Sequence, residues 1–192
     1  KGEPWEVEYP KYLGAYKVSI SNEIIKGSNN ILCQVKNITT KVASELTDTE
    51  KQTILNEYMF GLNSLELLSL SENLPYMEQA KNDFDMAIEN LFHKSPNYNN
   101  SKWSSLQFAE KTFKSKLEVN GIPFKRNHIL SELSNGLSII GINLSMQKIN
   151  NIQCEPQVRY ESNTVNRNEA ILAIQSALAL FADVFKYEVD NI

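Results

Sequence analysis

The chain has 192 residues, of which 42% are hydrophobic and 22% are charged, and this composition suits one globular core of moderate size. The formal net charge is −4 and the pI is about 5.3, so no overall basic field is present for binding duplex nucleic acid. Cys33 and Cys154 lie far apart and outside any CxxC pattern, which predicts reduced thiols in a cytoplasmic protein rather than disulfides or a zinc cluster. No apolar run approaches the roughly 20 residues of a membrane helix, so a soluble chain is expected.

The first 46 residues carry weak and mixed signals. Residues 1–11 contain two prolines and alternating acids, which is typical of an arm or an edge segment. Apolar residues alternate over 12–20 and favour a short strand. Over 31–42, apolar residues recur at steps of four, three and four, which predicts a helix despite two β-branched threonines.

Clearer helix signals follow from residue 47 onward. The 47–50 segment (TDTE) has the form of a capping box, so a helix should begin there. Pro75 suits the first turn of the next helix, and 120–123 (NGIP) shows the order of residues expected at a helix end. Asn166, with Glu169 three residues on, predicts the start of the last helix.

These patterns predict a mainly α fold. Five amphipathic helices are expected, near 48–70, 76–93, 100–119, 127–140 and 166–188. Their apolar faces must bury against one another, so we expect an antiparallel helical bundle over 76–188. Residues 1–75 would form an N-terminal extension that holds the short strand and whose first helices pack on the bundle. Residues 141–165 are polar and irregular and predict a long loop, a type of segment that is often functional.

Motifs of known enzyme classes are scarce. The patterns GxGxxG, GxxxxGK[ST], HExxH and GxSxG do not occur, and the chain has only two histidines, His93 and His128. Asp83 and Asp85 resemble the paired metal-binding acids of a nucleotidyltransferase. Residues two apart on a helix point about 200 degrees from each other, so a solvated helix surface explains these acids better. We therefore predict no metal and no cofactor.

Four segments match one family in order and spacing. Residues 76–91 (YMEQAKNDFDMAIENL) are similar to its first helix, and 106–117 (LQFAEKTFKSKL) to its second, which carries an A-E-K-x-x-K pattern. Residues 121–123 (GIP) then lead to 128–130 (HIL), similar to an H-x-L at the start of the third helix. The dipeptide at 159–160 (RY) matches a frequent R-Y before the final helix. The stretch 76–188 as a whole thus resembles a HEPN domain.

The resemblance implies a helical bundle that forms a homodimer and engages a nucleotide, RNA or a protein partner. Relatives include metal-independent ribonucleases of toxin and phage-defence systems, and non-catalytic partners of nucleotidyltransferases. The nucleases carry R-x(4-6)-H, in which histidine moves a proton while arginine stabilises phosphate charge. Arg167-Asn168 begins such a motif, but Leu172 occupies the histidine position. This departure indicates a non-catalytic member.

The resemblance also groups seven residues into a candidate anion-binding site: Lys111, Lys114, Arg126, His128, Arg159, Tyr160 and Arg167. Plainer explanations compete with this one. Glu110 and Lys114 are four residues apart on a predicted helix and would form a surface ion pair. His128 would cap or pack its loop, and Arg159 would bond to loop carbonyls. Trp103 lies on the apolar stripe of its helix, so it is predicted to be a core residue.

Three functions remain as hypotheses. The leading one is a non-catalytic HEPN-like binding protein for a nucleotide or a protein partner, such as a nucleotidyltransferase or a toxin, in a toxin–antitoxin or phage-defence setting. The second is a divergent metal-independent ribonuclease in which His128 and an arginine of the other protomer restore the cleft. The third is an immunity or inhibitor protein whose acidic surface blocks a basic toxin. The resemblance does not extend to residues 1–75.

Overall fold

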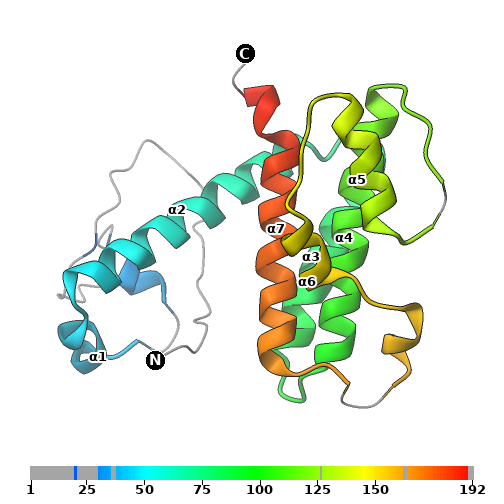
Figure 1. The fold of residues 1–192 in the computed structure, drawn as a ribbon. Coiled ribbons are helices and arrows are strands. Elements are labelled where there is room, and N and C mark those ends of the chain that lie inside the picture. The colour runs from blue at the N-terminus through cyan, green and yellow to red at the C-terminus, as the bar shows by residue number, and fades with distance from the viewer. Residues whose placement is uncertain (1–19, 21–29, 36–37, 126, 162–163, 190–192) are drawn as a thin grey trace. The chain divides into compact units, whose positions relative to one another are not determined.

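The computed structural model describes residues 20, 30–35, 38–125, 127–161 and 164–189, and they form the mainly α fold that the sequence predicts. Figure 1 shows the α-helices of this part of the chain. In chain order the elements are η1 (Ile31–Gln34), α1 (Thr40–Glu45), α2 (Asp48–Leu70), α3 (Met77–Phe92), α4 (Tyr98–Val119), α5 (Leu130–Ile139), α6 (Met146–Ile152), η2 (Pro156–Arg159) and α7 (Arg167–Val189), where η marks a 3₁₀ turn. These described elements include no strand. The strand expected over 12–20 lies outside the described residues except for Ile20.

The chain divides into two compact units, residues 1–65 and 66–192, with the boundary inside α2. The sequence had placed this boundary ten residues later, at 75/76. The described part of the first unit has apolar clusters of its own, which contain Ile31, Tyr58 and Leu62 in one case and Leu32, Val35 and Ala43 in the other. The second unit contains the helical bundle and all of the candidate site residues that the structure describes.

Helix α4 is the centre of the bundle. It packs against α3, α5 and α7, while α6 packs against α7. A row of aromatic rings crosses the interior, with centroids 5.0 Å apart for Phe84 and Phe108, 5.5 Å for Phe108 and Phe181, and 5.2 Å for Phe181 and Phe185. Small residues on α7 let its backbone approach its neighbours closely, and Ala170, Ala173 and Ala177 are fully buried. The Ala-rich face of α7 therefore packs within the bundle itself.

The bundle is not antiparallel throughout, which corrects the sequence-based expectation. Helices α3 and α4 run in opposite directions, as a short connection requires. Helices α4 and α7 are parallel: Asn99 near the start of α4 contacts Val165 just before α7, and Lys116 near the end of α4 lies 5.6 Å from the Phe185 ring centroid. The parallel arrangement is possible because the chain returns to the starting end of the bundle through the segment between α4 and α7.

Local hydrogen bonds explain why several helices begin and end where the sequence predicts. At the start of α2, the Glu50 amide donates to the Thr47 hydroxyl at 3.2 Å, and the Thr47 amide donates to the Glu50 carboxylate at 2.9 Å. Asn166 and Glu169 form the same reciprocal pair at α7. After α4, Gly121 adopts φ +67°, and the Ile122 amide bonds back to the Leu117 carbonyl at 2.9 Å. This is a Schellman motif, and both the capping-box and the Gly-Pro termination predictions are confirmed.

Other local predictions were wrong. The helix expected over 31–42 is broken into η1 and α1, because Asn30 and Thr39 each cap a separate short turn with their side chains. Pro75 precedes α3 instead of lying in its first turn, since Tyr76 takes a left-handed conformation with φ 65° as the N-cap. The long loop expected over 141–165 contains α6 and η2. Helix α6 was missed because its seven residues show too little periodicity to identify, although Ile149 and Ile152 are buried.

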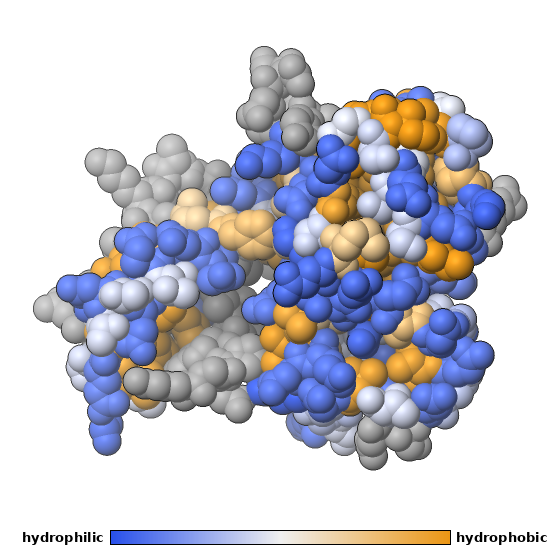
Figure 2. Space-filling view, viewed as in Figure 1, coloured by the Kyte–Doolittle hydropathy of each residue, from blue (hydrophilic) through white to orange (hydrophobic). Residues whose placement is uncertain are grey.

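Helix α7 also corrects the expectation that no stretch of the chain has the length and apolar character of a membrane helix. Its stretch Arg167–Lys186 is long and apolar enough to cross a membrane by length and composition alone. Half of the most apolar window is buried inside the bundle, where the helix packs on α4 and α6, and core helices of globular proteins commonly meet this criterion. Figure 2 shows hydrophilic residues over much of the visible face of the bundle, with hydrophobic patches near α5 and also toward the other end of the bundle.

Candidate functional site

A buried carboxylate on α4 is the centre of a polar cluster. The Glu110 side chain is only 5% exposed, and three side chains donate to it. Lys114 Nζ bonds to Oε1 at 2.5 Å, His128 Nδ1 bonds to Oε2 at 2.5 Å, and Gln107 Nε2 bonds to Oε2 at 3.2 Å. A carboxylate removed from water needs such donors, because an unpaired buried charge is strongly unfavourable. The predicted Glu110–Lys114 ion pair thus exists, but it lies in the interior and not on the surface.

His128 is held from several sides. Its ring nitrogen Nδ1 lies 2.5 Å from Glu110 Oε2 and 3.3 Å from Gln107 Nε2. A carboxylate acceptor favours the tautomer with the hydrogen on Nδ1, and in that tautomer Nε2 is the nitrogen available to a ligand. The imidazole meets the Trp103 indole edge-on, with ring centroids 5.4 Å apart. Its backbone carbonyl accepts from Gln153 Nε2 at 3.1 Å, and Gln153 Oε1 accepts from the Leu130 amide, so one side chain joins His128 to the start of α5. The imidazole is nevertheless 46% exposed, so a solute can reach it.

Arg159 contacts the same tryptophan. Its guanidinium carbon is 4.6 Å from the Trp103 ring centroid and 5.1 Å from that of Tyr160, both within the range of cation–π attraction. Arg159 Nε donates to the Pro156 carbonyl at 3.3 Å, which confirms the prediction of a bond to a loop carbonyl. Within the part of the chain that the structure describes, Arg159 has no carboxylate partner. Trp103 is buried as predicted, and it also connects His128 to Arg159.

Asn99 holds the turn that carries Arg159 and Tyr160. The two hydrogens of its amide nitrogen are shared among three acceptors, the Val158 carbonyl at 2.8 Å, the Glu161 carbonyl at 2.9 Å and the Thr164 hydroxyl at 2.9 Å, and its oxygen accepts from the Val165 amide at 3.1 Å. One amide group therefore ties both ends of the segment to α4. The sequence shows Asn99 only as part of an Asn-rich helix start, and nothing in that pattern indicates its role.

A separate ion pair lies between α3 and α4. Lys111 Nζ bonds to Asp83 Oδ2, and burial raises the pKa of the Asp83 carboxyl, although Lys111 acts in the opposite direction. Asp85 faces solvent. The helix thus separates the two acids, as predicted, but Asp83 is half-buried and paired and is not a solvated surface acid. Among the residues that the structure describes, no cluster of three or more His, Cys, Asp or Glu could hold a metal ion.

The structure brings together four of the seven predicted site residues. Lys114 and His128 meet at Glu110, and Arg159 and Tyr160 join them through Trp103. Lys111 instead pairs with Asp83. Arg167 is the first residue of α7 and is half-buried, and Arg126 lies outside the described residues. Sequence reasoning had missed three polar residues that organise the site: Gln107, Gln153 and Asn99.

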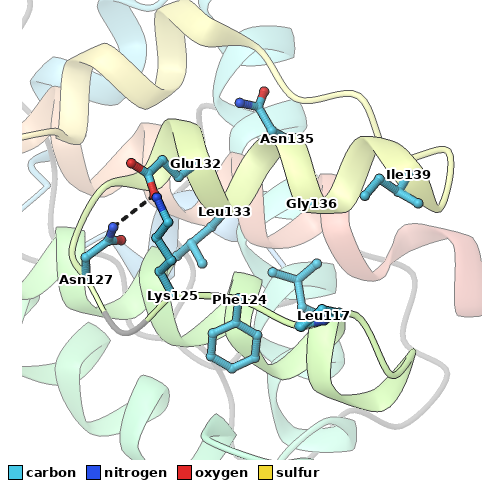
Figure 3. Close-up of a pocket in the computed structure, with 10 residues that line it drawn as sticks. Leu117, Phe124, Lys125, Asn127, Glu132, Leu133, Asn135, Gly136 and Ile139 are labelled. Carbon is cyan, nitrogen blue, oxygen red and sulfur yellow. Dashed lines mark hydrogen bonds and ion pairs between the residues drawn. The ribbon is translucent and has the colours of Figure 1, made fainter.

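A pocket of about 290 Å³ lies between the end of α4 and α5 (Figure 3). Its wall includes Leu117, Phe124 and Ile139, and an ion pair of 3.3 Å joins Lys125 to Glu132 beside it. Hydrogen bonds from Asn127 and Lys125 lower the pKa of the Glu132 carboxyl. These charged groups already satisfy one another, so this pocket offers less for a charged ligand than the surface around Arg159 does.

Comparisons with known proteins identify no relative. Family models, curated proteins and solved structures all gave no match to this chain. The HEPN resemblance of 76–188 accordingly rests on the sequence segments alone.

Proposed function

We propose that this chain is a non-catalytic, HEPN-like binding protein that holds the phosphate of a nucleotide at Arg159, with His128 beside it. The observation that carries the proposal is the state of the Arg159 guanidinium, which is stacked and exposed. A stacked guanidinium keeps its outer N–H groups free, and these match the geometry of a phosphate better than a lysine ammonium does.

Three lysines of the bundle are already paired, which distinguishes Arg159 from them. Lys111, Lys114 and Lys148 are each bonded to a carboxylate, whereas Arg159 has only a neutral carbonyl partner in the described part of the chain. The protein's net charge of −4 would repel a polyanion at long range. A local cation that contacts one or two phosphates suits a small ligand or a single strand better than a duplex.

The absence of catalysis is part of the proposal. Leu172 stands where the nuclease motif of the HEPN family has histidine, and a leucine cannot carry a proton.

We propose a cytoplasmic homodimer whose partners are a nucleotidyltransferase, a toxin or RNA in a toxin–antitoxin or phage-defence setting. The alanines of α7 do not support dimerisation, because they are already buried. Light scattering at tens of micromolar tests this proposal, and a monomer would contradict it.

Calorimetric titration with AMP and with inorganic phosphate tests the binding site. Arg159→Ala should weaken binding roughly 10- to 150-fold, because a hydrogen bond between charged groups contributes about 1.5–3 kcal/mol. Lys186→Ala is the matched control, since it removes an exposed cation near the opposite end of α7 and should leave binding unchanged. Absence of binding by the wild type, or equal losses in both variants, would refute the phosphate site.

One observation favours a second function, metal-independent RNA cleavage. The Glu110 carboxylate orients His128 and leaves Nε2 available to move a proton, with Arg159 as the cation that stabilises phosphate charge. RNA cleavage in the presence of EDTA that falls about 100- to 10,000-fold in His128→Ala would establish this activity and overturn the non-catalytic proposal. Equal inactivity of both proteins would exclude it.

A further inference from the structure

Tyr160 presents an unusually open aromatic ring next to Arg159. It is 80% exposed, which makes it the most exposed of the large hydrophobic and aromatic side chains in the described part of the chain. Its backbone is fixed all the same: its amide donates to the Gln157 carbonyl at 2.9 Å, and the Asn99 side chain holds the carbonyls of both Val158 and Glu161. A ring that is open to solvent thus projects from a turn with little freedom to move.

The guanidinium of Arg159 lies within cation–π distance of two rings with different surroundings. Trp103 is buried on α4, whereas Tyr160 faces solvent. The indole therefore supports the guanidinium from the protein interior, and the phenol ring extends the aromatic surface outward. A ligand that reaches Arg159 with an anionic group has a flat apolar face within reach beside it. Because the turn is already held by Asn99, little ordering is needed when a ligand binds.

We propose that Tyr160 is a stacking platform for a nucleobase, so that the Arg159–Tyr160 turn recognises a nucleoside phosphate unit through its phosphate and its base together. This inference rests on the proposed phosphate site and adds the residue that contacts the base. Inorganic phosphate or a sugar phosphate would use only Arg159. A base pair within a duplex could not stack, because its faces are covered by its neighbours. The unit belongs either to a free nucleotide or to a single strand, and both sources share the same chemistry.

The proposal predicts that the base contributes to affinity independently of the phosphate. Stacking of a base on an aromatic side chain corresponds to a change in affinity of roughly 5- to 150-fold. AMP and UMP should bind the wild-type protein more tightly than ribose 5-phosphate by a factor in this range. Tyr160→Leu should remove most of that ratio and leave ribose 5-phosphate binding unchanged. Tyr160→Phe should preserve the ratio, since it retains the ring.

The matched control is Phe92→Leu, which removes another exposed ring, at the end of α3. It should leave the ratio of AMP to ribose 5-phosphate affinity unchanged. Circular dichroism of each variant verifies the fold, and an exposed residue such as Tyr160 should tolerate either substitution. Equal affinity of the wild type for AMP and ribose 5-phosphate would overturn the stacking proposal. An undiminished ratio in Tyr160→Leu would overturn it too.

The two failures are distinguishable. If ribose 5-phosphate binds and depends on Arg159 while the base adds nothing, the phosphate site survives and the stacking platform is refuted. If no phosphate compound binds, the proposed function itself fails. A hexauridylate compared with UMP identifies the source of the ligand: a strand held by one phosphate should show a log–log salt slope of about −0.7, and a steeper slope indicates further phosphate contacts along a strand. Either slope, together with loss of binding in Tyr160→Leu, supports the platform.

Discussion

The two halves of the candidate site treat charge in opposite ways. At Glu110 the carboxylate is enclosed, and three protein side chains donate to it. At Arg159 the charge is exposed, and its only hydrogen bond in the described structure is to a carbonyl. His128 in the first half and Arg159 in the second both contact Trp103, so the two halves are neighbours. They differ in how far their charged groups are buried. Burial makes charge compensation necessary for folding, whereas exposure allows a cation to remain free for a ligand.

Of the substitutions in the two halves of the site, Glu110→Gln should cause the largest loss in the free energy of unfolding. The substitution leaves the Lys114 ammonium without its carboxylate at a site where the two side chains are 12% and 5% exposed. We expect a loss of about 3 kcal/mol in the free energy of unfolding, near the lower end for a broken buried pair, because Lys114 keeps some access to solvent. Urea unfolding measures it. Lys125→Ala, which breaks a solvent-exposed pair, is the control and should change stability little; a similar loss in both would contradict the distinction.

Cys154 lies in the chain between His128 and Arg159, so the reactivity of its thiol measures how well that segment is packed. Burial raises the pKa of its thiol from 9.0 to about 11, so at pH 8 the reactive thiolate is about 100-fold rarer than in an unfolded chain. Iodoacetamide labelling of a Cys33→Ser protein should be slower by that factor than labelling in urea. The folded state also retains the proton between about pH 9 and 11 while the unfolded thiol loses it, so stability should fall as pH rises through this window. Labelling at equal rates in both states would contradict the burial of the thiol.

Asn99→Ala should loosen the Arg159 half and spare the Glu110 half. It removes the hydrogen bonds between α4 and the 158–165 segment, which leaves the buried Val158 carbonyl and Val165 amide without their partner, whereas the partly buried groups of Glu161 and Thr164 can bind water. We expect a loss of about 2 kcal/mol, within the range for a buried polar group left without partners. Hydrogen exchange should quicken at Val165 and remain slow at Leu130. Equal acceleration at both amides would mean that the two halves unfold together.

Arg159→Ala should have the smallest effect on stability. The side chain is exposed and has no carboxylate partner in the described part of the chain, so the free energy of unfolding should change by less than about 0.5 kcal/mol. Thermal unfolding measures this directly. A loss as large as that of Glu110→Gln would show that the stack on Trp103 has a structural role, and the contrast between the two halves would fail.

The fold was predictable wherever hydrogen bonds are local. The capping pair of Thr47 and Glu50 and the pair of Asn166 and Glu169 each join residues three apart, so sequence order alone places their partners together. Short elements were not predictable in the same way. Helix α6 and the turns η1 and η2 are held by contacts with the rest of their units, and their few residues carry little periodicity.

The candidate site was predictable only in part. Arg159, Tyr160, Lys114 and His128 were selected through the family resemblance, and all four lie around Trp103. Lys111 was selected by the same reasoning, yet its position on α4 directs it to Asp83 on α3. Lys111 and Lys114 are three residues apart and point about 60 degrees from each other on α4, so the side chains that each one meets on neighbouring elements decide its partner.

The sequence by itself determined the helix-forming stripes, the ends of α2, α4 and α7, and the absence of histidine at residue 172. These features depend on residue types and on spacings of a few positions. Only the tertiary structure decided that α4 and α7 run parallel, that Glu110 is enclosed, and that Asn99 holds a segment about 60 residues away. Contacts across such separations depend on how whole helices pack, and for that reason the environment of Arg159 could not be read from its neighbours in the chain.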